Sequence, residues 1–429
     1  MSTQRATGGR GRKRKANAAE APAKKQKQKN IEHVSHRRES GIVLTIGEGD
    51  VGQLGLGEDV LERTKPGKVN IPDAVVQVHA GGMHTVCLTV NGEVYTFGCN
   101  DEGALGRDTT EEGSETLPVK ADLLEKVVQI SAGDSHTAAL TDDGRVFIWG
   151  TFRDANGVIG LLEERAVQKT PVQIFKDLVV VKIASGSDHI IALTTDGIIH
   201  TIGNSEQGQL GRLAECMCQR GGRKGVGVLI NPDKNESEVR CKRVKGKKLK
   251  FVDVWAGAFV SVAKEESGDM YAWGLNNYYQ LGAGDMVNRF VPQRMETFSK
   301  KQWKDIGIGM HHIIALDTEG KVHAIGRGEY GRLGLGEDCK EQKEPKHIGT
   351  MNGTKVSSIA SGSCCSFAVS TDGTALSWGM GSCKQLASTD DDEDAWEPTL
   401  MKGKQLENRS VIMVSSGGQH TVLLAKDKA

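Results

Sequence analysis

The feature that most constrains this chain is a pair of short phrases, each written seven times. The first is a strand that ends in an aromatic residue or isoleucine followed by glycine, at Gly47, Gly98, Gly150, Gly203, Gly274, Gly326 and Gly379. Successive glycines are 51, 52, 53, 71, 52 and 53 residues apart. The second is a glycine shortly before the start of an apolar strand, mostly in the form Gly-x-x-His, as at residues 133–136. Repeats of this length, built from short β-branched runs, predict an all-β, seven-bladed β-propeller rather than a helical solenoid.

The order of the two phrases predicts how the ring closes. The repeats open with a glycine-ended strand at Ile42–Gly47 that has no Gly-x-x-His strand before it. They finish with His420 and the strand Val422–Leu424, which has no glycine-ended strand after it. Each end therefore carries half a blade. Pairing the N-terminal and C-terminal half-blades would remove two exposed strand edges, so we expect a propeller over 36–429 that is closed in this way.

The net charge of zero conceals a basic N-terminal tail. Residues 1–29 hold ten Lys or Arg and one acid, a balance of +9. The segment has no apolar period, so residues 1–35 are predicted to be disordered. Two basic clusters suit a bipartite signal for a nuclear import receptor, and they also suit loose attraction to nucleic-acid phosphates; they comprise Arg12, Lys13, Arg14, Lys15, Lys24 and Lys25. A solvating tail with no partner is the alternative.

A second basic segment explains the long interval of 71 residues. Residues 212–250, the basic insert, contain twelve Lys or Arg and four acids, a balance of +8, and no aromatic residue. The remaining residues must then carry a net charge of −17, because these two segments contribute +9 and +8 and the net charge of the whole chain is zero. A base-stacking platform is disfavoured. Glycines beside arginines instead suggest fingers that meet phosphates or carboxylates, and a surface loop without a partner is the alternative.

Because the chain contains seven copies of its unit, equivalent positions can be compared internally. Histidine ends the second phrase in five copies, His84, His136, His189, His312 and His420, so we interpret these side chains as part of the core. The preceding position accepts many residue types, so the repeat does not account for Asp188 or His311 there. Asp134, one position earlier still, is acidic where its equivalents are Gly, Ser, Ala or Met. These three residues are candidates for partner contact, and the alternative is an arbitrary choice of surface residue, because loops vary freely.

Hairpin geometry predicts that the three candidates share one face. The start of one antiparallel strand lies beside the end of the next, so they should lie with the turns that follow each glycine-ended strand. We call this the turn face; its turns carry Asp50, Asp101, Glu206 and Glu329. The turn at 151–156 is longer than its equivalents and should protrude. The sequence contains no phosphate-binding, nucleophile or metal motif and no membrane-spanning run, so we expect a docking surface without cofactor, metal or covalent chemistry.

Several stretches resemble the regulators of chromosome condensation, the chromatin-bound exchange factors for the small GTPase Ran. The resemblance covers 36–426, and its most specific part is Phe152 to Leu162. It implies a guanine-nucleotide exchange factor that binds nucleosomes in the nucleus and promotes GDP release, generating Ran-GTP at chromatin. It also implies that residues 152–159 form a wedge against the nucleotide-binding region of the GTPase, comprising Phe152, Arg153, Asp154, Ala155, Asn156, Gly157, Val158 and Ile159.

The same resemblance assigns the remaining residues. It places Asp50, Asp134, Asp188 and His311 at the GTPase. On the opposite face, Arg220 and Arg223 would meet the acidic patch of the histone core. Nucleosomal DNA would be contacted by Arg243, Lys245, Lys247 and Lys248. The alternative function is a chromatin adaptor propeller without exchange activity, and an enzyme of covalent chemistry is a more distant one.

Overall fold

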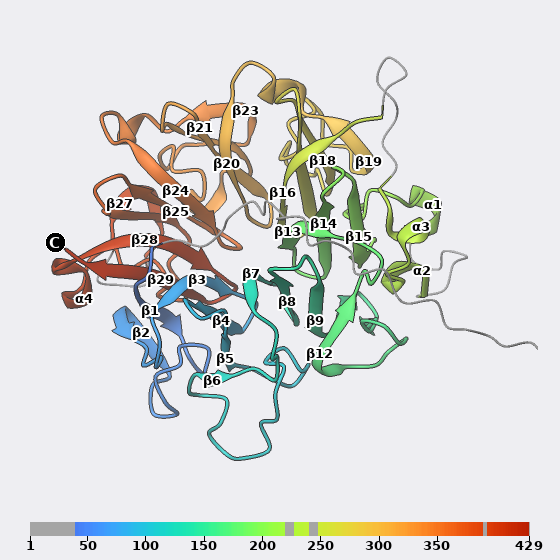
Figure 1. Cartoon of the computed structure of the whole chain (residues 1–429). Coiled ribbons are helices and arrows are strands. Elements are labelled where there is room, and N and C mark those ends of the chain that lie inside the picture. The colour runs from blue at the N-terminus through green and yellow to red at the C-terminus, as the bar shows by residue number, and fades with distance from the viewer. Residues whose placement is uncertain (1–38, 219–226, 240–247, 389–392, 429) are drawn as a thin grey trace, which may run out of the picture. The chain divides into compact units, whose positions relative to one another are not determined.

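The computed structural model describes residues 39–218, 227–239, 248–388 and 393–428. Within them, the strands form seven blades around a central cavity of about 410 Å³, which confirms the predicted β-propeller (Figure 1). Neighbouring strands in every blade are antiparallel, and the strand nearest the cavity comes first in blades 1 to 6. No helix in these ranges is long and apolar enough to cross a membrane.

Blades 1 to 6 follow one another along the chain. Blade 1 contains β3 (Val75–Ala80), β4 (His84–Thr89), β5 (Val94–Gly98) and β6 (Val119–Lys120). Blade 2 contains β7 (Val127–Ala132), β8 (His136–Thr141), β9 (Val146–Gly150) and β12 (Gln168–Ile174). Blade 3 has β13 (Val180–Ser185), β14 (His189–Thr194) and β15 (Ile199–Gly203), and blade 4 has β16 (Phe251–Gly257), β17 (Val260–Glu265), β18 (Met270–Gly274) and β19 (Arg289–Arg294).

Blades 5 and 6 each contain four strands that follow one another in chain order. Blade 5 contains β20 (Trp303–Ile308), β21 (His312–Asp317), β22 (Val322–Gly326) and β23 (Gln342–His347), and blade 6 contains β24 (Val356–Ser361), β25 (Cys365–Ser370), β26 (Ala375–Gly379) and β27 (Ala395–Leu400). Short 3-10 helices join strands at η1 (Glu296–Phe298), η2 (Glu329–Gly331) and η3 (Gly349–Met351). A short helix, α4 (Lys404–Glu407), precedes the closing blade.

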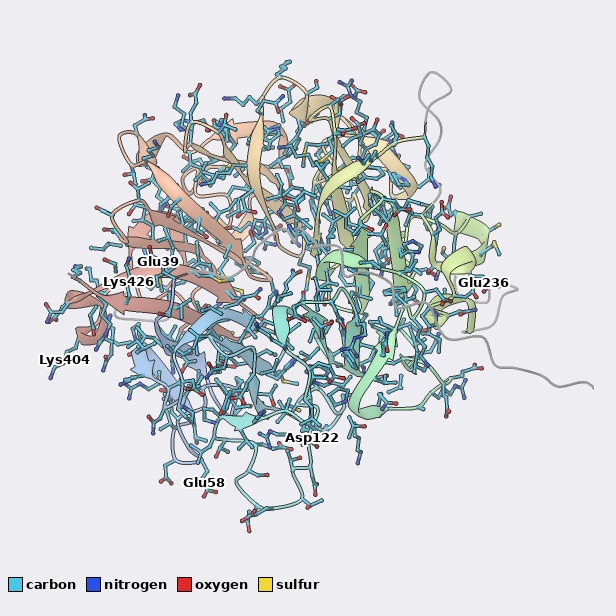
Figure 2. All side chains as sticks on the ribbon, viewed as in Figure 1. Glu39, Glu58, Asp122, Glu236, Lys404 and Lys426 are labelled. Carbon is cyan, nitrogen blue, oxygen red and sulfur yellow. The ribbon has the colours of Figure 1, made fainter. Side chains whose placement is uncertain are left out.

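The closing blade joins the two ends of the propeller. Its strand order is β2 (Glu62–Lys68), β1 (Ile42–Glu48), β29 (His420–Asp427) and β28 (Arg409–Ser416), with Gly47 opposite His420. In Figure 1 the blue strands β1 and β2 lie beside the red strands β28 and β29. At the rim Lys426 pairs with Glu39, and Figure 2 shows these two side chains together. The predicted pairing of half-blades is confirmed.

Backbone geometry explains why the first phrase of every repeat ends in glycine. All seven of these glycines have φ between +97° and +117°, a region that other residues rarely adopt. A Cβ on Gly98 would lie 2.6 Å from the carbonyl oxygen of Met83, the residue before the neighbouring strand β4. The aromatic residue before the glycine packs against the preceding blade, as when Trp149 Nε1 donates to the Ala104 carbonyl at 2.8 Å. The first phrase therefore encodes a tight strand end together with a contact between blades.

The repeated histidines join neighbouring blades, as their interpretation as core residues requires. The Nε2 of each bonded histidine lies 2.8–2.9 Å from a hydroxyl of the next blade, in the pairs His84–Thr137, His189–Ser261, His312–Ser366 and His420–Thr85. Each hydroxyl donates onward to a backbone carbonyl and so accepts from Nε2–H. Burial lowers the pKa of His189 to about 3, so the ring is neutral.

Candidate functional site

The long turn in blade 2 forms a separate two-stranded hairpin. Its strands are β10 (Arg153–Asp154) and β11 (Gly157–Val158), paired Arg153 with Val158 and Asp154 with Gly157. The Asp154 carboxylate accepts the Asn156 N–H at 2.7 Å, and Gly157 supplies the positive φ of +115° that closes the turn. The predicted protrusion at 151–156 is therefore a hairpin that carries exposed side chains at its tip.

The two ends of the predicted wedge are buried anchors. Phe152 is fully buried and Ile159 is 1 % exposed, and both belong to the apolar core shared by blades 2 and 3. The Phe152 ring meets the His136 imidazole edge to face, with centroids 4.8 Å apart. A partner can therefore touch residues 153–158, whereas Phe152 and Ile159 fix the base of the hairpin.

His136 differs from the bonded histidines of the repeat. The hydroxyl position of the next blade is occupied by Ile190 here, and neither ring nitrogen of His136 has a hydrogen-bond partner among the described residues. Burial holds the pKa of His136 well below its usual range, so the imidazole is uncharged. Blade 2 therefore lacks the histidine hydrogen bond to the next blade that four other blades make. The Phe152 ring packs against His136 at this position.

Polar side chains of blades 1 and 3 hold the hairpin from both sides. Asp188 Oδ1 accepts the Arg153 N–H at 2.7 Å, and Asn204 Nδ2 donates to the Arg153 carbonyl at 2.9 Å. Glu206 accepts the Ala155 N–H at 3.3 Å. From blade 1, Glu102 pairs with the Arg153 guanidinium. The repeat does not require an acidic residue at the position of Asp188, but in this structure the Asp188 carboxylate helps to hold the hairpin.

Two of the predicted acidic residues influence one another electrostatically. Asp188 is half-buried, and its burial together with the negative charge of Asp134 raises its pKa to about 7. Asp134 keeps contact with solvent, yet the protein atoms around it also raise the pKa of its carboxyl. The turn face therefore holds one carboxyl that titrates near neutrality directly beside the hairpin.

His311 belongs to a different, aromatic part of the turn face in blade 5. Its ring lies edge to face against Tyr278 at 5.1 Å, and the Arg327 guanidinium lies over the same Tyr278 ring at 4.7 Å. Burial, with the nearby charges of Arg332 and Arg327, lowers the pKa of His311 to about 4. His311 is consequently a neutral hydrogen-bonding group at physiological pH.

The four predicted turn-face residues come from four blades. Asp50 follows β1 in the closing blade, where it is exposed and its Oδ1 accepts from Gln53 Nε2 at 3.1 Å. Asp134, Asp188 and His311 precede the second strands of blades 2, 3 and 5. The strand pairing sets each of these strand starts opposite a glycine, as with His189 and Gly203, which is the arrangement expected of a common face.

The basic insert takes the place of an outer strand in blade 3. Its described parts include α1 (Glu215–Cys218), α2 (Gly227–Ile230) and α3 (Lys234–Ser237), and a single bridge joins Glu238 to His200 of β15. Arg212 fixes the insert by donating to the carbonyls of Thr201 and Leu229 at 3.1 and 3.2 Å. The insert is therefore anchored to the propeller by its first residues and by α2 and α3.

Of the residues predicted to bind nucleosomes, the structure places one. Lys248 is largely exposed and pairs with Glu238 at 2.9 Å. Arg220, Arg223, Arg243, Lys245 and Lys247 lie outside the described residues, as does the basic tail with Arg12, Lys13, Arg14, Lys15, Lys24 and Lys25. Their assignments stay predictions.

Comparison with known proteins identifies the family. The model of the RCC1-like domain matches residues 42–423. The regulator of chromosome condensation of Homo sapiens is 54 % identical over 404 residues, covering 93 % of this chain and 94 % of the human protein. The chain belongs to the regulator of chromosome condensation family. Guanine nucleotide exchange factor SRM1 of Saccharomyces cerevisiae, also similar, is 29 % identical, with 88 % of this chain and 85 % of the yeast protein covered.

Two solved structures are similar across almost the whole chain. Prp20p from Saccharomyces cerevisiae superposes with a TM-score of 0.81 and 27 % identity, covering 92 % of this chain and 94 % of that one. The yeast protein solved in complex with Kap60 gives a TM-score of 0.82 and 26 % identity, with 97 % of both chains covered. The regulator of chromosome condensation fold therefore extends over almost the whole chain.

Reasoning from the sequence of this family member missed the supports of the hairpin. The repeat pattern does not indicate Asn204 or Glu102, and it distinguishes Glu206 only by its charge. The signal for Asn204 was weak, because its position in the repeat is otherwise held by Glu48, Cys99, Thr151, Leu275, Arg327 and Met380. A position that varies so freely predicts neither a core role nor a particular partner.

Proposed function

We propose that this protein is a guanine-nucleotide exchange factor for the small GTPase Ran, acting in the nucleus on chromatin. Membership of the regulator of chromosome condensation family supports this, as does the similarity to a yeast protein named a guanine nucleotide exchange factor. The observation that carries the proposal is the hairpin of residues 153–158, which is held by side chains of blades 1 and 3 and stands on the turn face. A propeller that served only as a chromatin adaptor would have no need of this brace.

The proposed mechanism follows from how a GTPase holds its nucleotide. Backbone N–H groups cradle the phosphates and Mg²⁺ neutralises them. The hairpin would press into this region, while Asp50, Asp134 and Asp188 attract its basic groups and neutral His311 offers a hydrogen bond. Because the exchange factor binds the nucleotide-free GTPase best, it accelerates release without changing the affinity of the free GTPase for nucleotide. No covalent step and no cofactor is involved.

Release of a fluorescent GDP from Ran tests the proposal directly. With excess unlabelled nucleotide, catalytic amounts of this protein should raise the release rate by orders of magnitude, and the rate should saturate with Ran concentration. Unchanged release together with intact nucleosome binding would instead favour the adaptor function.

Chromatin binding is assigned to the basic insert. Prp20p from yeast is described with binding properties to Gsp1p and histones. We assign Arg220 and Arg223 of this chain to the acidic patch of the histone core, because arginine forms bidentate bonds to carboxylates. Arg243, Lys245, Lys247 and Lys248 are assigned to DNA phosphates, where each acts as a charge.

Arginine-to-lysine substitutions distinguish these two assignments. Arg220→Lys and Arg223→Lys are expected to weaken nucleosome binding markedly, because lysine cannot reproduce the bidentate bond. Lys247→Arg, which keeps the charge, should be nearly silent. Gel-shift titrations against nucleosomes with a native and a neutralised acidic patch measure the difference, and nucleotide release from free Ran is the control. Equal binding to both nucleosomes would rule out the histone contact.

The basic tail is assigned to nuclear import and to nonspecific DNA affinity. Yeast RCC1 (Prp20) has been solved bound to Kap60, and the tail of this chain carries a balance of +9 over residues 1–29. Deleting those residues should lower nuclear accumulation and reduce the salt dependence of DNA binding. Exchange on Ran should be intact. Normal nuclear and chromatin levels of the truncated protein would assign import to another segment.

A further inference from the structure

The hairpin depends on its neighbours for a fixed orientation, because two-stranded ribbons are at best marginally stable alone. The Ile159 N–H donates to the Phe152 carbonyl at 2.8 Å, so these two residues form a hydrogen-bonded pair. Bonded and non-bonded pairs alternate in an antiparallel ladder. The next pair, Arg153 with Val158, is therefore non-bonded, and the peptide groups of Arg153 face away from β11.

The Asn204 side chain occupies the gap between this outer edge and blade 3. Its amide nitrogen donates to the Arg153 carbonyl at 2.9 Å, and its amide oxygen accepts the Glu206 N–H at 2.7 Å. Its own N–H donates to the Asp188 carbonyl at 2.7 Å. Only 4 % of the residue is exposed. One side chain thus fixes the hairpin and also shapes the turn that presents Glu206 to Ala155.

We propose that Asn204 is a positioning residue for the wedge, holding the hairpin in the orientation that acts on the GTPase. This role rests on the proposed exchange function. The blade itself does not need the amide, since threonine, cysteine, leucine and methionine occupy the equivalent position in other repeats. Asp188 accepts from the N–H of Arg153 and Asn204 donates to its carbonyl, so together they fix the plane of β10, which pairs only with β11 among the described strands.

The substitution Asn204→Asp isolates the donor function. The new carboxylate can still accept the Glu206 N–H, but its second oxygen would face the Arg153 carbonyl, which loses its partner. Loss of a buried hydrogen bond and repulsion between two oxygens should favour a displaced hairpin. Because small misplacements of a group that acts on a reacting centre are costly, kcat for nucleotide release should fall about tenfold to a hundredfold. The KM for Ran should change much less, since the docking carboxylates are retained.

Hydrogen exchange measures how firmly Asn204 holds the hairpin, independently of exchange activity. In Asn204→Asp the amides of 153–158 should exchange at least about tenfold faster, whereas those of β9 should be unchanged. The matched control is Asn276→Asp in the turn after β18. That asparagine also accepts a backbone N–H, from Leu281 at 3.0 Å, and donates to a carbonyl, that of Asp285 at 2.8 Å, but it belongs to another blade. It should leave the exchange of the hairpin amides and kcat as they are.

Each outcome has a distinct meaning. Unchanged hairpin exchange in Asn204→Asp, or a loss that appears only in KM, would overturn the positioning role. If the wild-type protein released no nucleotide, the proposed function would be wrong. Hydrogen exchange would still test whether Asn204 positions the hairpin. Asn204→Thr, the residue type found at the equivalent Thr151, serves as the second variant if the aspartate variant does not fold. It too should accelerate hairpin exchange, and protection like that of the wild type would contradict the proposal.

Discussion

Replacing Phe152 with alanine is expected to lower the free energy of unfolding by about 3–5 kcal/mol and to remove most of the exchange activity. The ring is fully buried beneath the hairpin, against the unbonded His136 and the core between blades 2 and 3. The cavity left behind would remove the base on which β10 and β11 stand. The side chain does not reach the surface, so its effect on the GTPase would be transmitted entirely through the hairpin.

The control is a phenylalanine of equal burial elsewhere in the ring. Phe367 on β25 in blade 6 is also fully buried, and Phe367→Ala should cost a similar free energy of unfolding. Denaturant titration and stopped-flow release of nucleotide should show two variants of similar stability with very different kcat at temperatures where both are folded. Equal activity of the two would mean that the hairpin does not act on the GTPase.

The second large effect is expected at Asp188, in the form of a pH dependence. Its pKa of about 7 means that the carboxylate, the form that best accepts the Arg153 N–H and attracts basic groups, is gained as pH rises from about 6 to 8. Exchange should therefore rise across this range. Asp188→Asn keeps an oxygen acceptor for the hairpin but loses the charge, and should flatten the profile. Asp188→Ala should weaken docking by about 2–5 kcal/mol if the charge is desolvated in the complex.

Stability should change in the opposite sense. The raised pKa means that the folded protein binds this proton more tightly than the unfolded chain, whose carboxyl titrates near about pH 4. The contribution of Asp188 to stability is therefore full below about pH 4 and declines as pH rises toward 7. Asp134→Asn should shift the activity profile to lower pH, because a neighbouring negative charge is removed. Asp196→Asn, at the exposed opposite end of blade 3, should leave the profile unchanged, and a shift there would point to a general charge effect.

The repeat made the architecture predictable, because each copy reports the same local geometry. The seven glycines with positive φ and the bonded histidines are architectural, and comparison of equivalent positions recovered them. The same comparison also selected Asp134, Asp188 and His311 as residues that the repeat does not require. It could not reveal Asn204, because an amide that bonds across blades shows no pattern within its own repeat. Nor could it show that Phe152 faces the core, since the length of a turn does not say which of its residues are buried.

The closing blade has a consequence for how the chain matures during synthesis. The hairpin β1–β2 is made first, but its partner β29 is made last, roughly 380 residues later, which takes roughly 20 to 80 seconds at about 5–20 residues per second. Throughout that interval one edge of β1, buried in the finished ring, has no partner and could pair with another chain. We therefore expect a nascent chain to need this edge shielded until β29 has been made. A circular permutant that begins between two intact blades would avoid the wait, because every sheet would then be completed soon after its first strand is made.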